Sequence, residues 1–190
     1  MFKLTLWQIN LNAWYLLLIV WGIAALKHKP DKASEPLPSR LLYGVYFVVG
    51  FALLFSNRLP LGVLRQRFVP NYEWIALLGV AVTYLGVATA LWARFSLADN
   101  WSGRITVKVG HQLIRSGPYA YVRHPIYTGV LLSVAGTALQ VGEWRGLLAI
   151  AMVVISFAMK AKREEAYMSA EFGDAYAQYQ QQTGFLLPKV

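Results

Sequence analysis

The chain of 190 residues is 57% hydrophobic and 14% charged, carries a formal net charge of +9 and contains no cysteine. Soluble domains carry about 25% charged residues, so this composition excludes an ordinary soluble protein. The lack of cysteine excludes disulfides, thiolate metal sites and a cysteine nucleophile. The basic residues flank long apolar runs, where they meet lipid headgroups, and they do not alternate with stacking aromatic residues. We therefore expect a membrane protein with no nucleic-acid partner.

Three apolar runs in the first half of the chain predict membrane-spanning helices, since roughly 20 apolar helical residues cross a bilayer. They cover Leu6–Leu26, Leu41–Phe55 and Trp74–Phe95. A polar, proline-rich loop follows the first run, and a connector with three arginines follows the second. We expect Asn10 and Asn12, inside the first run, to form hydrogen bonds between helices.

The stretch from Ser96 to Arg123 breaks this pattern because it is polar and contains glycine. Alternating apolar and polar side chains over residues 105–109 predict a short strand. Gly110 could turn this strand back toward Leu113 and Ile114.

Two shorter apolar runs, Ile126–Val141 and Gly146–Met159, predict a helical hairpin with a tight turn over residues 142–145. Pro125 would stand in the first turn of its first helix, where the missing N–H costs nothing. The polar tail from Lys160 should begin as a helix, whose apolar face consists of Tyr167, Phe172, Tyr176 and Tyr179.

The fold class expected is therefore an all-α integral membrane protein with about five transmembrane helices, a functional loop and a C-terminal helix. It would form one membrane domain, with three helices in residues 1–95 and the loop, hairpin and tail in residues 96–190. With five spans, 5 of the 18 lysines and arginines face one side and 13 face the other. Because the more basic side is normally cytoplasmic, we expect the N-terminus outside and the loop and tail in the cytosol.

Chemically versatile side chains gather between residues 110 and 129, beside the predicted hairpin. Among them are two histidines, and no histidine pair has the helical spacing of metal ligands. Arg123 could hold a carboxylate through two bonds, and Glu164 with Glu165 could pair with Arg123 or bind a cationic ligand. Taken singly, these residues have simpler explanations: Arg123 as a headgroup anchor, His124 as a helix cap, and the two glutamates as a solvated helix face.

The ordered set of motifs resembles the isoprenylcysteine carboxyl methyltransferase family, within a wider group that includes phospholipid methyltransferases. The first motif comprises His111, Leu113, Ile114, Gly117, Pro118 and Tyr119, and the second Arg123, His124, Pro125, Tyr127 and Gly129. After the hairpin come Glu164–Glu165, the pattern Phe172-Gly173-x-x-Tyr176-x-x-Tyr179, and a closing segment at residues 183–188. The resemblance covers about residues 95–188.

This resemblance implies S-adenosylmethionine-dependent methyl transfer to a lipophilic acceptor that enters from the bilayer, with membrane lipids as neighbours. It agrees with the absence of a Gly-x-Gly-x-x-Gly dinucleotide motif. The cofactor contacts implied are His111, Gln112, Leu113, Ile114, Gly117, Tyr119, His124, Pro125, Tyr127, Glu164 and Glu165.

The resemblance also implies that a substrate carboxylate attacks the methyl group directly, because a carboxylate is already ionised near neutral pH. We expect Arg123, Glu165 and Lys160 to be the catalytic residues. Arg123 would orient the substrate, while Glu164 or Glu165 would hold the amino end of the cofactor or brace Arg123. Lys160 and Lys162 stand where the family often has arginine, and lysine lacks the planar guanidinium fork.

Two other functions remain open on the sequence. Membrane sterol and steroid reductases carry a related Arg-His-Pro-x-Tyr segment and use NADPH, although the Glu164–Glu165 pair and the first motif favour the methyltransferase. A scaffold without catalytic activity that binds lipid is the second alternative. No motif in the first three predicted helices identifies the acceptor.

Overall fold

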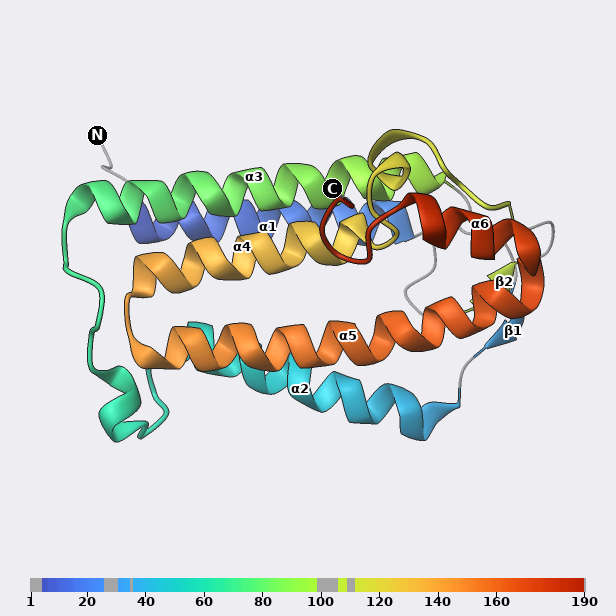
Figure 1. Cartoon of the computed structure of the whole chain (residues 1–190). Helices are drawn as coiled ribbons and strands as arrows, with labels where there is room; N and C mark the ends of the chain where they lie inside the picture. The colour runs from blue at the N-terminus through green and yellow to red at the C-terminus, as the bar shows by residue number, and fades with distance from the viewer. Residues whose placement is uncertain (1–4, 26–30, 35, 99–105, 109–111, 190) are drawn as a thin grey trace.

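The computed structural model describes residues 5–25, 31–34, 36–98, 106–108 and 112–189 of the chain. Five long helices form a bundle whose members run along one common direction (Figure 1). They are α1 (Leu6–Ala25), α2 (Leu37–Phe55), α3 (Glu73–Leu97), α4 (Pro125–Val141) and α5 (Trp144–Phe172). Shorter elements are β1 (Asp31–Ser34), η1 (Gly62–Arg65), β2 (Thr106–Lys108), η3 (Gly117–Ala120) and α6 (Asp174–Gln182).

The five predicted apolar segments are all helices. Four of them, α1, α2, α3 and α5, are long and apolar enough to cross a membrane, and α4 is a shorter apolar helix of 17 residues. Large apolar side chains such as Leu18, Val48 and Leu85 are about 60% exposed on the outside of the bundle, as expected of a surface that faces lipid. The chain is therefore an integral multi-pass membrane protein.

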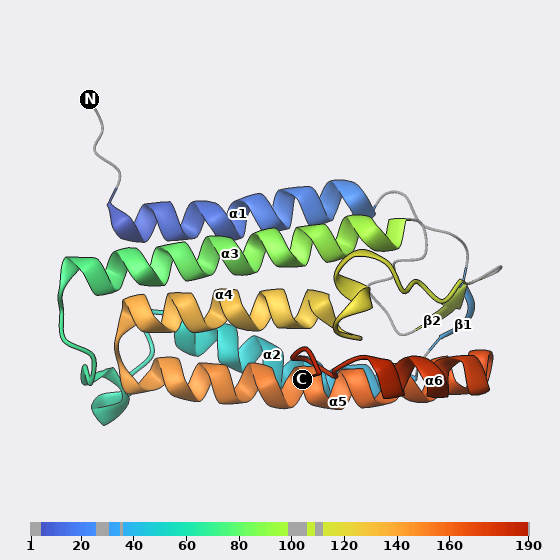
Figure 2. The same ribbon diagram turned by 45° about the horizontal axis from the view of Figure 1, so that its top comes forward.

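The helices are arranged around α4, which packs against α3 on one side and α5 on the other. Helix α1 covers α3, and α2 covers α5 (Figures 1 and 2). Successive helices run in opposite directions, so η1 and the α4–α5 turn lie at one end of the bundle. The strands, η3, the start of α4 and α6 gather at the other end, which is called the site end below.

Helices α3 and α4 lie against each other through small residues. A Cβ added at Gly86 would come 2.5 Å from the Gly129 carbonyl oxygen, and one at Gly136 would come 2.5 Å from the Thr83 nitrogen. Such separations leave no room for a side chain, and small residues are how membrane helices achieve close backbone contact. Gly129, the last residue of the second motif, therefore serves helix packing.

A buried polar cluster joins α1, α3 and α4 beside this contact. The Asn10 side-chain amide donates to Thr83 Oγ1 at 3.2 Å, and Asn10 Oδ1 accepts from Thr137 Oγ1 at 3.0 Å. Asn10 is fully buried, which confirms its predicted bonds between helices. Asn12 instead lies on the exposed face of α1, so the prediction for Asn12 was wrong.

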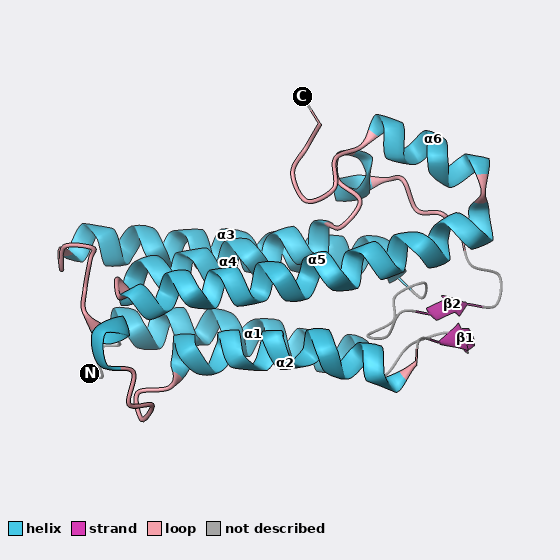
Figure 3. Cartoon of the chain, turned by 60° about the horizontal axis from the view of Figure 1, so that its bottom comes forward, coloured by secondary structure: helices cyan, strands magenta, loops and turns pink. Residues whose placement is uncertain are grey.

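The predicted strand at residues 105–109 is present as β2, although its expected partner was wrong. Strand β2 pairs antiparallel with β1, which lies in the proline-rich segment predicted to be a loop (Figure 3). Leu113 and Ile114 are not in a strand, and Gly110 lies outside the described residues. The pairing joins segments about 75 positions apart along the chain, and local alternation carries no information about such a partner.

The tail continues α5 well past its apolar part and then folds back. Helix α5 ends at Phe172, Gly173 adopts a φ of +51°, and α6 returns along the site end (Figure 1). Tyr176 and Tyr179 of α6 are buried, whereas Tyr167 and Phe172 are half-buried. This reversal carries the last residues of the chain back onto the start of α4.

Candidate active site

The second motif lies where the chain leaves η3 and enters α4. Pro125 occupies the first turn of α4, as predicted, and His124 is the residue before the helix. The His124 side chain makes no capping hydrogen bond to the helix backbone, so the simple capping role is wrong. Its ring is 7% exposed and faces α5 instead.

Glu164 and Glu165, called the carboxylate pair below, meet His124 from α5. The Nδ1 atom of His124 lies 3.5 Å from Glu164 Oε2, and its Nε2 atom lies 3.3 Å from Glu165 Oε1. Both ring nitrogens thus face a carboxylate, an arrangement that suits an imidazolium with two N–H donors. The carboxylate pair is therefore not a solvated helix face.

The pKa of His124 reflects this environment. Burial alone lowers the pKa of the imidazole, but hydrogen bonds and charge from Glu164 and Glu165 outweigh the burial, so the pKa lies above its ordinary value. His124 is consequently a cation over a wider pH range than a free histidine.

Arg123 is fixed by acceptors that belong to the protein. Its Nε donates to Glu165 Oε1 at 2.6 Å, and its Nη1 donates to the carbonyl oxygens of Thr183 at 2.5 Å and Gln180 at 3.2 Å. The side chain is 12% exposed. Gln180 Nε2 in turn donates to Glu165 Oε2 at 3.2 Å. Sequence reasoning missed Gln180, which follows directly after the quoted tyrosine pattern.

Residues 183–186, called the C-terminal strap below, are held against the segment that carries the second motif. Backbone N–H groups of Arg123 and His124 donate to the carbonyl oxygens of Gly184 and Phe185 at 2.9 and 3.3 Å. Thr128 Oγ1 donates to the Leu186 carbonyl oxygen at 2.6 Å. The closing segment of the resemblance thus has a definite structural place, as the strap that fixes Arg123 and His124.

Aromatic rings form the wall of the site toward the interior of the bundle. Tyr127 donates through its hydroxyl to Glu164 Oε2 at 2.7 Å, and its ring stacks between those of His124 and Phe157 at 5.4 and 4.6 Å. The ammonium of Lys160 lies 5.6 Å from the centre of the Tyr127 ring. The site therefore places two carboxylates beside ring faces and three basic side chains.

The first motif contributes less directly. Gly117 has a φ of +60° and packs against Ser96 at the end of α3, so its role is a turn. The carbonyl oxygen of Tyr119 accepts the Tyr179 hydroxyl at 2.7 Å, and burial raises the pKa of the Tyr119 hydroxyl. Half-buried Leu113 and Ile114 and exposed Gln112 precede this turn. His111 lies outside the described residues.

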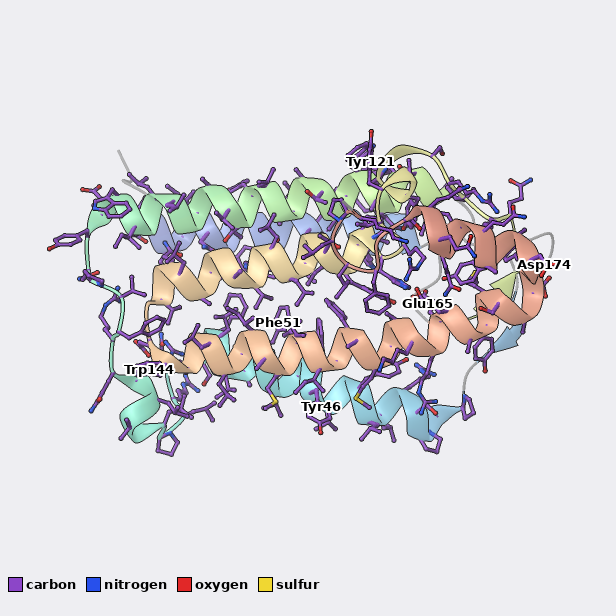
Figure 4. All side chains as sticks on the ribbon, in the orientation of Figure 1. Tyr46, Phe51, Tyr121, Trp144, Glu165 and Asp174 are labelled. Carbon is purple, nitrogen blue, oxygen red and sulfur yellow. The ribbon has the colours of Figure 1, made fainter. Side chains whose placement is uncertain are left out.

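The chemical groups of the site determine what kind of ligand it could hold. Within the described ranges, no group of three or more histidine, aspartate or glutamate side chains could hold a metal. Two adjacent carboxylates can hold an ammonium group, and ring faces attract cations that carry methyl groups. Figure 4 shows Glu165 at the site end of α5, where α6 folds back toward it.

Comparison with known proteins links the part of the chain that carries these features to one family. Residues 77–170 match the model of the isoprenylcysteine carboxyl methyltransferase (ICMT) family. A protein-S-isoprenylcysteine O-methyltransferase of Schizosaccharomyces pombe is 36% identical over 81 residues, which are 42% of this chain and 34% of that protein. Protein-S-isoprenylcysteine O-methyltransferase B of Arabidopsis thaliana is 29% identical over 171 residues, covering 83% of this chain and 87% of that protein.

A solved structure supports the same relationship. The eukaryotic intramembrane Ras methyltransferase ICMT aligns with a TM-score of 0.53 and 25% identity, over 81% of this chain and 53% of that one. The chain therefore spans about a third of the yeast relative and about half of the solved structure. The match includes His124 and the carboxylate pair, since all three residues lie within residues 77–170.

Proposed function

Because residues 77–170 of this chain match the model of the isoprenylcysteine carboxyl methyltransferase family, we propose that the protein transfers a methyl group from S-adenosylmethionine to the carboxylate of a lipophilic acceptor. The observation that supports this most is the carboxylate pair, which faces His124 and the Tyr127 ring at one end of a membrane bundle. The relatives are protein-S-isoprenylcysteine O-methyltransferases, whose acceptor is an isoprenylated cysteine.

The charges of the site match those of the methyl donor. S-adenosylmethionine carries an ammonium, a sulfonium and a carboxylate, and it would supply an electrophilic methyl group. Glu164 would hold the ammonium, while Glu165 would brace Arg123. His124 and Arg123 keep the two carboxylates in place through the contacts given above.

The proposed reaction requires no proton transfer. When bound, S-adenosylmethionine would supply its methyl carbon to an oxygen of the acceptor carboxylate, and the electron pair of the broken carbon–sulfur bond would stay on sulfur. The products are a methyl ester and a neutral thioether. The carboxylate is ionised near neutral pH, so the protein has to position two reactants and exclude water, and positioning is a large contribution to rate.

The contacts of Arg123 bear on which residues would meet the acceptor. With Glu165 and two carbonyl oxygens bound to Arg123, the geometry favours Glu165 as a brace for Arg123, one of the two roles expected for the carboxylate pair. Lys160 then becomes the better candidate for the group that meets the acceptor carboxylate. The acceptor would enter from the bilayer, with the site end in the cytosol.

Methyl transfer itself provides the test. Purified protein in a neutral detergent is supplied with methyl-labelled S-adenosylmethionine and N-acetyl-S-farnesylcysteine, and the labelled ester is extracted and counted. We expect turnover by the wild-type protein and a loss of at least about a hundredfold in Glu164→Gln, as when a group that positions reactants is removed. Turnover that persists undiminished in Glu164→Gln and Arg123→Ala would contradict the proposed site.

A further inference from the structure

Tyr43 of α2 reaches the site from a helix that the family match does not include. Its ring is 9% exposed, and its centre lies 5.9 Å from the Lys160 ammonium. The backbone at Tyr43 is tied to α5, because Ser156 Oγ donates to its carbonyl oxygen at 2.8 Å. Tyr43 is therefore held at a fixed place beside the same face of α5 that carries Lys160.

Lys160 consequently lies against two aromatic faces from two different helices. The Tyr127 ring of α4 is 5.6 Å from the ammonium, and the Tyr43 ring of α2 is 5.9 Å from it. Both distances fall within the range of cation–π attraction. Lys160 also precedes Glu164 by four residues, so the two side chains share one face of α5.

We infer that Tyr43 is a positioning residue that holds the Lys160 ammonium against Tyr127, where it can meet the carboxylate of an anionic, amphiphilic acceptor. This inference rests on the proposed function and adds a residue of α2 to the groups that recognise the charged head of its acceptor. A lysine ammonium sits on a flexible stem, and two ring faces restrict its motion at the site end of the bundle.

The neighbouring side chains suit the apolar part of such an acceptor. The rings of Phe47 and Phe157 continue from Tyr43 and Tyr127 into the bundle, with centres 5.7 Å apart, and Phe51 stacks on Phe47 at 4.5 Å. With the Lys160 ammonium at the site end of this aromatic series, the charged head of an amphiphile would meet Lys160 and its chain would lie toward the rings.

The test compares three variants of α2 in neutral detergent, so that no anionic lipid competes. Tyr43→Leu removes the ring face, Tyr43→Phe retains it, and Tyr46→Leu removes a tyrosine that lies on the outer side of α2 (Figure 4). The KM for N-acetyl-S-farnesylcysteine is measured with the Kd for S-adenosylhomocysteine. We expect Tyr43→Leu to raise the KM about fivefold, as the loss of one partly desolvated cation–π contact would.

The same change should leave the Kd for S-adenosylhomocysteine unaltered, and both Tyr43→Phe and Tyr46→Leu should keep the wild-type KM. The uncharged carboxamide analogue, used as an inhibitor, should bind the wild type and Tyr43→Leu equally well. A KM unchanged in Tyr43→Leu, equal weakening of carboxylate and carboxamide, or no rescue by Tyr43→Phe would overturn the inference.

The readouts separate this inference from the proposed function. In one outcome, the wild type binds S-adenosylhomocysteine and methylates the probe while Tyr43→Leu leaves the KM unchanged. That result would overturn the role of Tyr43 alone. Wild-type protein that binds neither S-adenosylhomocysteine nor the farnesylated probe would overturn the proposed function together with this role.

Discussion

His124 has a carboxylate at each of its ring nitrogens, and its pKa is raised because Glu164 and Glu165 outweigh the effect of burial. A group whose pKa is higher in the folded than in the unfolded protein contributes its full stabilisation at pH values below its unfolded-state pKa. This contribution is lost as the pH rises through the folded-state pKa.

We therefore expect the ligand-free protein to lose thermal stability as the pH rises above 6.5, the ordinary value for histidine. The measurement is the melting temperature in detergent across this range for the wild type and His124→Gln. Because glutamine does not titrate, the variant should lack that part of the pH dependence. Parallel curves for the two proteins would show that His124 is not the group responsible.

Arg123 has a structural task that lysine cannot perform. Its planar guanidinium reaches Glu165 and the carbonyl oxygens of Gln180 and Thr183 at once, and a lysine ammonium lacks that fork. We expect Arg123→Lys to lower the free energy of unfolding by about 2 kcal/mol, as for lost hydrogen bonds to a charged group.

Limited proteolysis offers a local readout of the same change. Release of the C-terminal strap in Arg123→Lys should expose residues 183–189 to carboxypeptidase, whereas Arg163→Lys, on an exposed part of α5, should digest like the wild type. Equal digestion rates for Arg123→Lys and the wild type would contradict the role of Arg123 as the clamp of the strap.

At this scale the sequence could identify residues that belong to a spaced motif. His124, Tyr127 and the carboxylate pair do come together, from segments about 40 positions apart. Gln180 and Tyr43 were missed because their contribution depends on where a helix reversal and a neighbouring helix place them. Arg123 was identified, but its hydrogen bonds to the carbonyl oxygens of Gln180 and Thr183 depend on backbone geometry that residue types do not encode.

Among the elements, the contact between α3 and α4 depends most on single positions. A Cβ on Gly86 would come 2.5 Å from the Gly129 carbonyl oxygen, so the helices must separate to accept it. We expect Gly86→Ala to destabilise the protein by about 1–3 kcal/mol, the usual cost of overpacking. The measurement is unfolding in SDS, followed by circular dichroism.

Gly44→Ala is the matched control, because nothing lies within 4 Å of a Cβ added at this position of α2. Alanine is the better helix former by about 1 kcal/mol, so Gly44→Ala should be neutral or slightly stabilising. Equal effects at Gly44 and Gly86 would mean that helix propensity, and not the approach of α3 to α4, determines the result.

The elements themselves were predictable to different degrees. Apolar runs located all five long helices, although α2 begins four residues before the predicted Leu41 because Pro38 fits the first turn of a helix. The α4–α5 turn was also predicted, and Gly142 there has a φ of +67°. Strand β1 was not, since a four-residue polar segment becomes a strand only through pairing with β2.

For the whole molecule, the distribution of basic residues predicts that the site end faces the cytosol and the N-terminus faces out. Because the chain has no cysteine, single-cysteine variants report the orientation cleanly. We expect Val63→Cys, 68% exposed in η1, to react with a membrane-impermeant maleimide in intact cells. Gln181→Cys, exposed at the site end, should react only after the cells are opened.

Labelling of Gln181→Cys alone in intact cells would mean the reverse orientation. If the two cysteines behave alike, both positions lie on the same side of the membrane. An even number of helices would then cross between them, and α4, with 17 residues, would be the helix that does not cross.

Calorimetric titration of the purified, detergent-solubilised protein with S-adenosylhomocysteine, and separately with NADPH, tests the central claim most directly. The claim is that the carboxylate pair and His124 form the binding site of the methyl donor. It predicts that S-adenosylhomocysteine binds the wild type, that Glu164→Gln abolishes this binding, and that NADPH does not bind. Binding of NADPH alone, or of S-adenosylhomocysteine with equal affinity to Glu164→Gln, would contradict it.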